Sequence, residues 1–152
     1  MKIIVAAIGR AKTGPERELF QSYLARLPWT VELKEIEIKK ESDTGTRVAR
    51  EGSALVNACP PQARIIALDE RGKTETSAMF AARIGRWRDD GDRTIVFLIG
   101  GADGLDDAIR SRADTILSFG SVTWPHMLVR ALLAEQLYRA HSILSGHPYH
   151  RA

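Results

Sequence analysis

Short apolar segments alternate with amphipathic segments along the whole chain, and this alternation limits the folds open to it. Five segments have the composition of β-strands: residues 2–9, 31–38, 64–70, 93–101 and 114–120. Five others have helical periodicity: residues about 15–26, 45–58, 75–89, 104–111 and 125–144. Strands that alternate with helices are typical of α/β proteins. We therefore predict an α/β fold with a mostly parallel sheet.

The residue patterns also indicate where some strands lie in the sheet. Residues 31–38 alternate apolar and polar side chains, which indicates an exposed or edge strand. Residues 64–70 and 93–101 are continuously apolar and rich in β-branched residues, as expected of strands that are buried on both faces.

Length, charge and cysteine content narrow the class of protein. A chain of 152 residues is long enough for one domain with a substantial core. Its net charge of +3 permits an anionic partner without requiring one. Cys59 is the only cysteine, which excludes a disulfide framework and a thiolate zinc site and favours a reducing, cytosolic setting. We expect no targeting segment and no membrane span, because no run approaches about 18 apolar residues.

Three strand ends carry unusual residues. They are LDERGK (68–73), IGGADG (99–104) and SFGSVTWPH (118–126). In parallel α/β sheets, ligands bind beyond the carboxyl ends of the strands. We therefore expect these three loops to converge on one binding site.

Taken singly, the three motifs leave alternatives open. The glycines of residues 99–104 follow neither the dinucleotide fingerprint nor the phosphate loop, so that motif alone favours a tight strand-to-helix turn. The charged residues of 68–73 surround an expected turn at Gly72 and could orient a ligand or simply be solvated. The hydroxyl-rich loop before Pro125 could hold an adenine through main-chain hydrogen bonds or be an ordinary connection.

The last predicted helix, residues 125–144, is apolar nearly all round, which indicates burial on several sides and a subunit interface. Glu135 and Arg139 are four residues apart and could form an ion pair. All four histidines lie between residues 126 and 150. No metal-binding motif accompanies them, so a general base or an RNA contact is the favoured role.

Four segments together resemble a known family. LDERGK, FLIGGADGL, TWPHMLVRALLAEQLYRA and GHPYHR look like the RlmH family of SPOUT-class methyltransferases, which modify N3 of a pseudouridine in large-subunit (23S) ribosomal RNA. The resemblance covers essentially the whole chain in order and is most specific from residue 93 onward.

This resemblance implies a fold, a cofactor and partners. It implies a single SPOUT domain, residues 1–152, whose part from about 93 to 152 forms a trefoil knot and the helix of a homodimer. The implied cofactor is S-adenosylmethionine, with no metal and no membrane contact, and the implied partner is the assembled ribosome in the cytoplasm. The implied cofactor-binding residues are Leu68, Gly100, Gly101, Phe119, Gly120, Ser121, Val122, Thr123 and Trp124.

The resemblance also suggests catalytic roles. N3 of pseudouridine carries an imide proton that must leave before the nitrogen can attack a methyl group. The candidates for proton removal are His150 first and Glu135 second, with Tyr149 placed to stack on or bind the base and Arg139 to stabilise an anionic base. The candidates for RNA contact are Arg130, His147 and Arg151. In a dimer, the terminal segment of one chain could complete the pocket of the other.

Three other functions compete with this interpretation. A methyltransferase of the same class that acts on transfer RNA is the nearest, and the PYHR sequence argues against it. A non-catalytic RNA-binding module would not need the glycines at 100, 101 and 120. A nucleotide-binding or hydrolytic enzyme would need a phosphate-loop lysine, a nucleophile elbow or a metal cluster, none of which the sequence contains.

Overall fold

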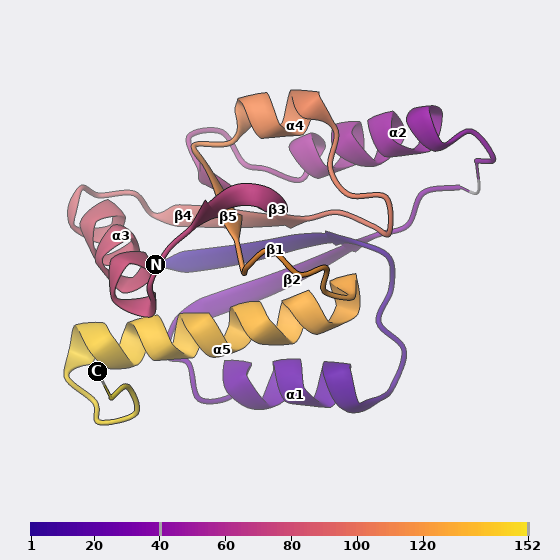
Figure 1. Ribbon diagram of the computed structural model, residues 1–152. Coiled ribbons are helices and arrows are strands. Elements are labelled where there is room, and N and C mark those ends of the chain that lie inside the picture. Colours follow the sequence, from indigo (N-terminus) through magenta and orange to yellow (C-terminus); the bar gives the residue numbers. More distant parts are fainter. Residues whose placement is uncertain (40, 152) are drawn as a thin grey trace.

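Strands and helices alternate strictly in the computed structural model, which describes residues 1–39 and 41–151 (Figure 1). In chain order the elements are β1 (Lys2–Ile8), α1 (Pro15–Leu24), β2 (Thr30–Ile36), α2 (Thr44–Asn57), β3 (Arg64–Thr74), α3 (Ser77–Asp89), β4 (Thr94–Ile99), α4 (Asp107–Arg112), β5 (Thr115–Ser118) and α5 (His126–Ser145). The alternation predicted from the sequence is therefore confirmed.

The strands form one sheet in the order β2-β1-β4-β3-β5, and every pairing between neighbouring strands is parallel. Strand β2 lies at an edge, as its alternating pattern predicts. Strands β1 and β4 lie inside the sheet, and nearly all of their side chains are buried. Because all strands run the same way, their carboxyl ends meet at one edge of the sheet.

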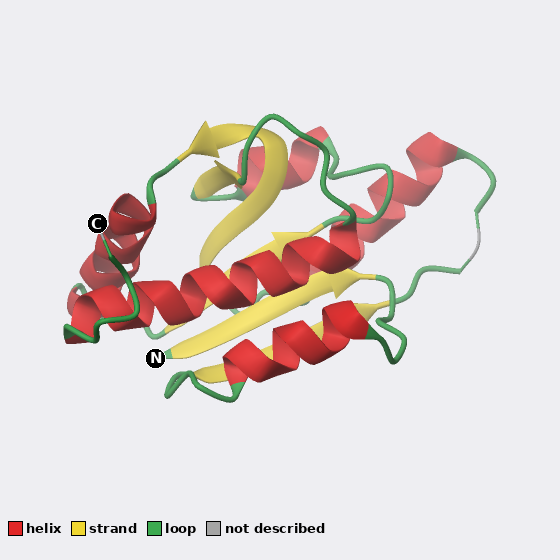
Figure 2. Cartoon of the chain, turned by 60° about the horizontal axis from the view of Figure 1, so that its bottom comes forward, coloured by secondary structure: helices red, strands yellow, loops and turns green. Residues whose placement is uncertain are grey.

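Helices cover both faces of this sheet. Helices α1, α3 and α5 lie on one face, whereas α2 and α4 lie on the other (Figures 1 and 2). The first face buries Phe97 of β4 against Phe80, Leu133 and Leu137 of the helices. The second face buries alternate strand residues, such as Leu98, against Leu55 of α2 and Ile109 of α4. The fold is thus a three-layer α/β/α sandwich.

Side-chain caps determine where three of the helices begin. The Asp43 carboxylate accepts the amide of Thr46 at 2.8 Å before α2, and the Thr76 hydroxyl accepts the amide of Met79 at 3.1 Å before α3. Helix α4 begins at Asp107, three residues later than the sequence pattern indicates. The turn that pairs Gly101 with Gly104 comes first, and Asp106 then caps the helix.

Strand β3 corrects one prediction. A turn is expected at Gly72, but β3 continues to Thr74, with a register shift between Leu68 and Lys73 in its pairing with β5. A Cβ added at Gly72 would lie 2.6 Å from the carbonyl oxygen of Ile116. Glycine is needed there because the backbones of β3 and β5 approach closely, not because the chain reverses.

Helix α5 crosses the face of the sheet between α1 and α3 (Figure 2). Ala131 and Ala134 of α5 pack on Phe20 of α1. Leu144 packs so closely on α3 that a Cβ added at Gly85 would lie 2.8 Å from its Cδ2 atom. The burial on several sides that the sequence predicts for this helix is confirmed.

Candidate active site

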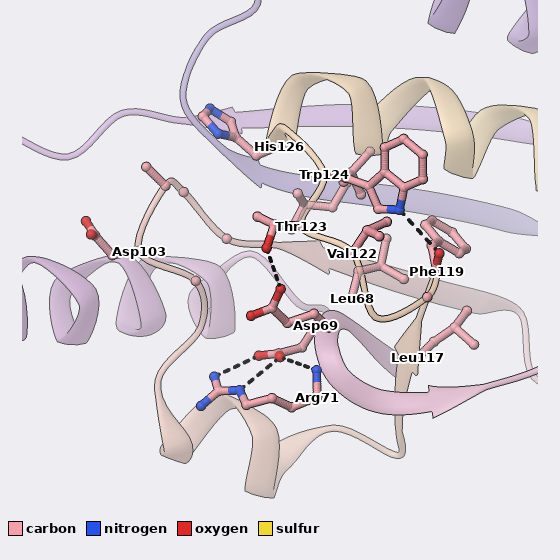
Figure 3. Close-up of a pocket in the computed structure, with 18 residues that line it drawn as sticks. Leu68, Asp69, Arg71, Asp103, Leu117, Phe119, Val122, Thr123, Trp124 and His126 are labelled. Carbon is pink, nitrogen blue, oxygen red and sulfur yellow. Dashed lines mark hydrogen bonds and ion pairs between the residues drawn. The ribbon is translucent and has the colours of Figure 1, made fainter.

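A cavity of about 430 Å³ opens where strands β4 and β5 end, beside residues 68–71 of β3 (Figure 3). Its volume lies in the range of roughly 300–1,000 Å³ that is typical of small-molecule sites. It is lined by residues 68–71, 99–104, 117, 119, 120, 122–124, 126 and 129. The three segments that were predicted to converge therefore line one cavity.

The cavity brings together eight of the nine residues predicted to bind the cofactor. Those eight are Leu68, Gly100, Gly101, Phe119, Gly120, Val122, Thr123 and Trp124. Ser121 belongs to the same loop but does not line the cavity. His126, the last residue of the third predicted segment, and Val129 also line it, and neither was among the residues predicted to bind the cofactor. Their spacing of three residues, at the start of a helix that follows a predicted binding loop, is the signal that could have identified them.

Gly100 permits the sharp turn at the end of β4. A Cβ added to Gly100 would lie 2.7 Å from the carbonyl oxygen of Gly104, closer than real Cβ atoms approach other atoms. The turn folds back through the Gly101–Gly104 bridge and leaves backbone atoms exposed along the cavity wall. Backbone this close to a cavity suits a ligand held by main-chain groups.

Internal hydrogen bonds hold the loop of residues 118–124 in shape. The Ser118 hydroxyl donates to the carbonyl of Gly120 at 2.8 Å and accepts its amide at 3.1 Å. The indole N–H of Trp124 donates to the carbonyl of Phe119 at 3.3 Å, and Thr123 donates to Glu70 at 3.0 Å (Figure 3). The loop is thus tied both to itself and to β3.

Acidic side chains dominate the polar part of the cavity. The Asp69 carboxylate accepts hydrogen bonds from Nε and Nη2 of Arg71, each at 3.0 Å. Glu70 accepts from Thr123, and Asp103 lies across the cavity from them, where it pairs with Arg47 of α2 (Figure 3). The remaining wall includes the buried apolar side chains of Ile99 and Leu117. Such a cavity suits a ligand that combines an apolar part with a positively charged group.

His126 lies at the mouth of the cavity, at the start of α5. Burial, together with the neighbouring charge of Arg130, lowers the pKa of its imidazole below the ordinary value. The neutral form is therefore favoured, and His126 can donate or accept a hydrogen bond without adding positive charge to the cavity.

A second polar cluster forms where residues 146–151 fold back along α5. Glu135 Oε1 accepts from Arg139 Nε at 3.0 Å and from the Tyr149 hydroxyl at 3.0 Å. Its other oxygen accepts from Gln136 at 2.7 Å. The guanidinium carbon of Arg139 lies 4.8 Å from the centre of the Tyr149 ring. The ion pair predicted between Glu135 and Arg139 is confirmed.

Two pKa shifts follow from this cluster. Burial raises the pKa of Tyr149 well above that of a free phenol, and its hydrogen bonds to Tyr23 and Glu135 act in the same direction. The Glu135 carboxylate raises the pKa of Arg139 in turn. Tyr149 therefore stays protonated and acts as a hydrogen-bond donor.

His150 contacts Arg139 through a ring nitrogen. Its Nδ1 lies 3.2 Å from Arg139 Nη1. A guanidinium can only donate, so Nδ1 accepts and the neutral ring carries its proton on Nε2. His150 can take up a proton at Nδ1 only after the hydrogen bond to Arg139 has broken.

The three residues predicted to contact RNA differ in exposure. His147 and Arg151 are exposed on the segment that follows α5. Arg130 is only 2% exposed, and its Nη1 pairs with Glu35 at 2.8 Å. Its Nη2 also donates to the carbonyl of Gly9 at 2.8 Å. Arg130 therefore lies within the fold and not on its surface.

One chain does not bring the cavity and the polar cluster together. His126 lines the cavity, whereas Arg139 belongs to the cluster thirteen residues further along α5. At about 1.5 Å per residue, those positions lie roughly 20 Å apart along the helix. The sequence analysis placed both groups of residues in one site, and only the structure shows that they lie at different places along α5.

The described part of the chain carries neither a metal cluster nor a membrane span. No three His, Cys, Asp or Glu side chains within residues 1–39 and 41–151 form a group that could hold a metal ion. No helix in those same residues is long and apolar enough to cross a bilayer.

Comparisons with known proteins agree on one family. The family model described as "Predicted SPOUT methyltransferase" matches residues 1–150. The ribosomal RNA large subunit methyltransferase H of Paramagnetospirillum magneticum is 55% identical over 151 residues, which are 99% of each chain. The protein of the same name from Rhodospirillum centenum is 54% identical over 153 residues and 100% of each chain.

Among solved structures, the SpoU methyltransferase AviRb from Streptomyces viridochromogenes, in complex with AdoMet, also resembles this chain. The similarity has a TM-score of 0.45 at 13% identity, and it covers 93% of this chain and 57% of that one.

Proposed function

The chain belongs to the SPOUT methyltransferase family, and from this membership we propose that it transfers the methyl group of S-adenosylmethionine to large-subunit ribosomal RNA. The observation that carries the proposal is the full-length similarity to two ribosomal RNA large subunit methyltransferases, at 55% and 54% identity. The resemblance to the RlmH family, which is most specific from residue 93 onward, supports a finer assignment: N3 of a pseudouridine, methylated on assembled ribosomes in the cytoplasm.

The cavity at the ends of β4 and β5, beside residues 68–71 of β3, fits the cofactor. Its apolar walls suit an adenine ring, and the turn at Gly100 leaves no space for a side chain beside the main chain. The carboxylates of Asp69, Glu70 and Asp103 suit the ammonium and sulfonium charges. When bound, the cofactor supplies a methyl group on a positively charged sulfur. No metal is needed to activate such a group.

The residues of the polar cluster can supply the proton transfer. We assign proton removal from N3 to Nδ1 of His150, with Glu135 as the second candidate. Arg139 would leave His150 and donate to the anionic base that forms, which frees Nδ1 at the moment when it is needed. Tyr149, which stays protonated, would bind or stack on the base.

A dimer would join the cavity to the cluster. We propose a homodimer through α5, in which residues 146–151 of one chain complete the cavity of the other. The roughly 20 Å between the two groups within one chain supports this arrangement. So do the half-buried apolar side chains of α5, such as Leu132. We further assign residues from about 93 to 152 to a trefoil knot. The sheet order supports this assignment, because the chain must cross β3 on its way from β4 to β5.

The proposal is tested by transferring labelled methyl groups from S-adenosylmethionine to three substrates. These are assembled ribosomal particles that lack the modification, free ribosomal RNA and transfer RNA. We expect N3-methylpseudouridine, identified by mass spectrometry, only on the assembled particles, because a net charge of +3 gives weak affinity for free RNA. Label on transfer RNA would refute the substrate. No label and no cofactor binding by calorimetry would leave an RNA-binding module.

A further inference from the structure

A second cavity of about 460 Å³ lies beside the cofactor cavity, and the proposed function does not use it. Its lining residues come from the carboxyl ends of β1 and β2 and from the beginnings of α1 and α5. These parts of the four elements lie at one end of the molecule (Figure 1). Met127 lines this second cavity, whereas the preceding residue, His126, lines the cofactor cavity. A Cβ added at Gly9 would contact both side chains, at 3.4 and 3.8 Å. The two cavities are therefore neighbours on one edge of the sheet.

Cations outnumber carboxylates around this second cavity. Arg10, Lys12, Arg17 and Arg130 line it, together with the two carboxylates of Glu16 and Glu35. Glu35 already accepts from Arg130 and from the Ala11 amide. By contrast, the three exposed cations form no ion pair with any residue among 1–39 and 41–151. The cavity therefore presents positive charge that the described chain does not neutralise.

Helix α1 adds backbone donors to the same cavity. Gly14 provides no side-chain cap, and Pro15, the first helical residue, has no N–H. The amides of Glu16 and Arg17 come before Glu18, whose amide is the first to bond back, to the carbonyl of Gly14. Amides in the first turn of a helix lack helical acceptors and favour anions.

Arg130 supplies an independent indication of a ligand. It is 2% exposed, it lines the cavity, and its Nη atoms are bonded to Glu35 and to backbone carbonyls. Its Nε, however, has no hydrogen-bond partner within the described residues. A buried donor without a partner is unfavourable, so the guanidinium beside this cavity has one N–H that the described residues leave unsatisfied.

We propose that this cavity binds a phosphate group of the RNA substrate, next to the nucleotide that is methylated. The inference rests on the proposed function, which supplies the RNA. The exposed cations and the first-turn amides of α1 would hold the phosphate, and Phe20, Leu33 and Met127 offer an apolar wall to the attached nucleoside. Because the cofactor cavity lies on the other side of His126, a phosphate held here places the next nucleotide toward the methyl group.

Binding is tested first without catalysis. Uridine 5′-monophosphate is titrated into the isotopically labelled protein, and the amide signals of Glu16 and Arg17 and the Nε–H signal of Arg130 are followed by NMR. We expect these signals to shift with the monophosphate and not with uridine. An equal response to uridine, or no response to either probe, would overturn the proposal. The double variant Lys12→Ala/Arg17→Ala should lose the response.

Kinetics on ribosomal particles then test the role of the cavity. We expect Lys12→Ala/Arg17→Ala to raise KM about 10-fold, and the slope of log affinity against log salt to fall by about one for each cation removed. Affinity for S-adenosylmethionine and kcat should not change. The control is Arg86→Ala on α3, which removes an exposed cation that forms no ion pair within the described residues.

The contradicting outcomes are distinct. A similar rise in KM for Arg86→Ala would mean that the loss of any surface cation weakens RNA binding, and it would refute the site. A change of oligomeric state in the double variant, measured by sedimentation, would place the cavity in a subunit interface and refute it too. A wild-type enzyme that methylates particles but gives no uridylate response overturns only this inference. A wild-type enzyme that transfers no methyl group overturns the proposed function.

Discussion

At the scale of single residues, Glu51 is a carboxylic acid enclosed beside the glycine turn of the cofactor cavity. Its side chain lies close enough to Gly101 that a Cβ added there would be 3.3 Å from Oε1. It is 7% exposed, and its Oε2 has no hydrogen-bond partner in the described chain. Burial raises the pKa of Glu51, although the nearby Arg47 opposes the shift.

This shift has a defined effect on stability. The shift contributes fully to the free energy of unfolding below the ordinary pKa of glutamate. This contribution is lost as the pH rises through the higher pKa that Glu51 has in the folded protein. We expect Glu51→Gln to raise the melting temperature at pH 8, but not at pH 4, by about 2–4 °C, which is what 1 kcal/mol gives in a domain of this size. Thermal unfolding of the variant and the wild type at both pH values measures this change in melting temperature.

Glu37→Gln is the control, because the Glu37 side chain is exposed just after β2. This variant should show no such difference in melting temperature between the two pH values. A Glu51→Gln variant that is less stable at both pH values would mean that the negative charge itself is needed by the folded protein.

Arg130 shows what residue type alone does not reveal. The sequence predicts that Arg130 contacts RNA, but nothing near it in the chain indicates that its side chain is buried. In the fold it is buried at the ends of β1 and β2, where Glu35 and two backbone carbonyls accept hydrogen bonds from its two Nη atoms. These partners are 95 and more residues distant in the chain, so no local pattern could indicate them.

At the scale of elements, the turn after β4 depends on the absence of a side chain at residue 100. We expect Gly100→Ala to abolish cofactor binding, measured by calorimetry. The added methyl group would collide with the Gly104 carbonyl and open the turn. Gly45→Ala in α2 is the control, because its added Cβ would have only an ordinary contact, at 3.6 Å from Asp43. Unchanged binding by Gly100→Ala would remove the turn from the cofactor site.

Elements were predictable where periodicity decides them. The positions of β1, β2 and β4 and of α1, α2 and α5 follow from apolar patterns and agree with the structure to within two residues at each end. Two elements differ more: α4 begins three residues late, and β3 runs four residues beyond the expected range. There a charged, glycine-containing stretch is held as a strand by β5, and such a tertiary effect overrides local propensity.

The grouping of the three cavity-lining segments was likewise predictable, because the carboxyl ends of parallel strands must share an edge. The second cavity was not predicted. Its cations, residues 10–17, lie in a connection without a recognised motif. Only the fold places that connection beside the start of α5, more than a hundred residues later.

At the scale of the whole molecule, the separation of cavity and cluster predicts complementation between two defective chains. His150→Ala should lower turnover about 10²–10⁴-fold with cofactor affinity unchanged, and Gly100→Ala should lack cofactor. If the site combines two chains, co-expression of both variants gives heterodimers with one intact site. We expect about a quarter of the wild-type activity in the mixture.

The measurement is methyl transfer by the co-purified mixture, compared with each variant alone. A mixture no more active than its parts would mean that each chain completes its own site, and that residues 146–151 reach the cavity within one chain. Variant Leu132→Glu, which places a charge on the half-buried face of α5, provides the monomer reference by sedimentation.

The two neighbouring cavities on one edge of the sheet impose an order of events. RNA seated at the start of α1 would cover the mouth of the adjoining cavity, since only the first turn of α5 separates them. The methyl donor must then arrive before the RNA, and the spent donor can leave only after the methylated RNA has gone. Turnover would then be limited by departure of the methylated RNA.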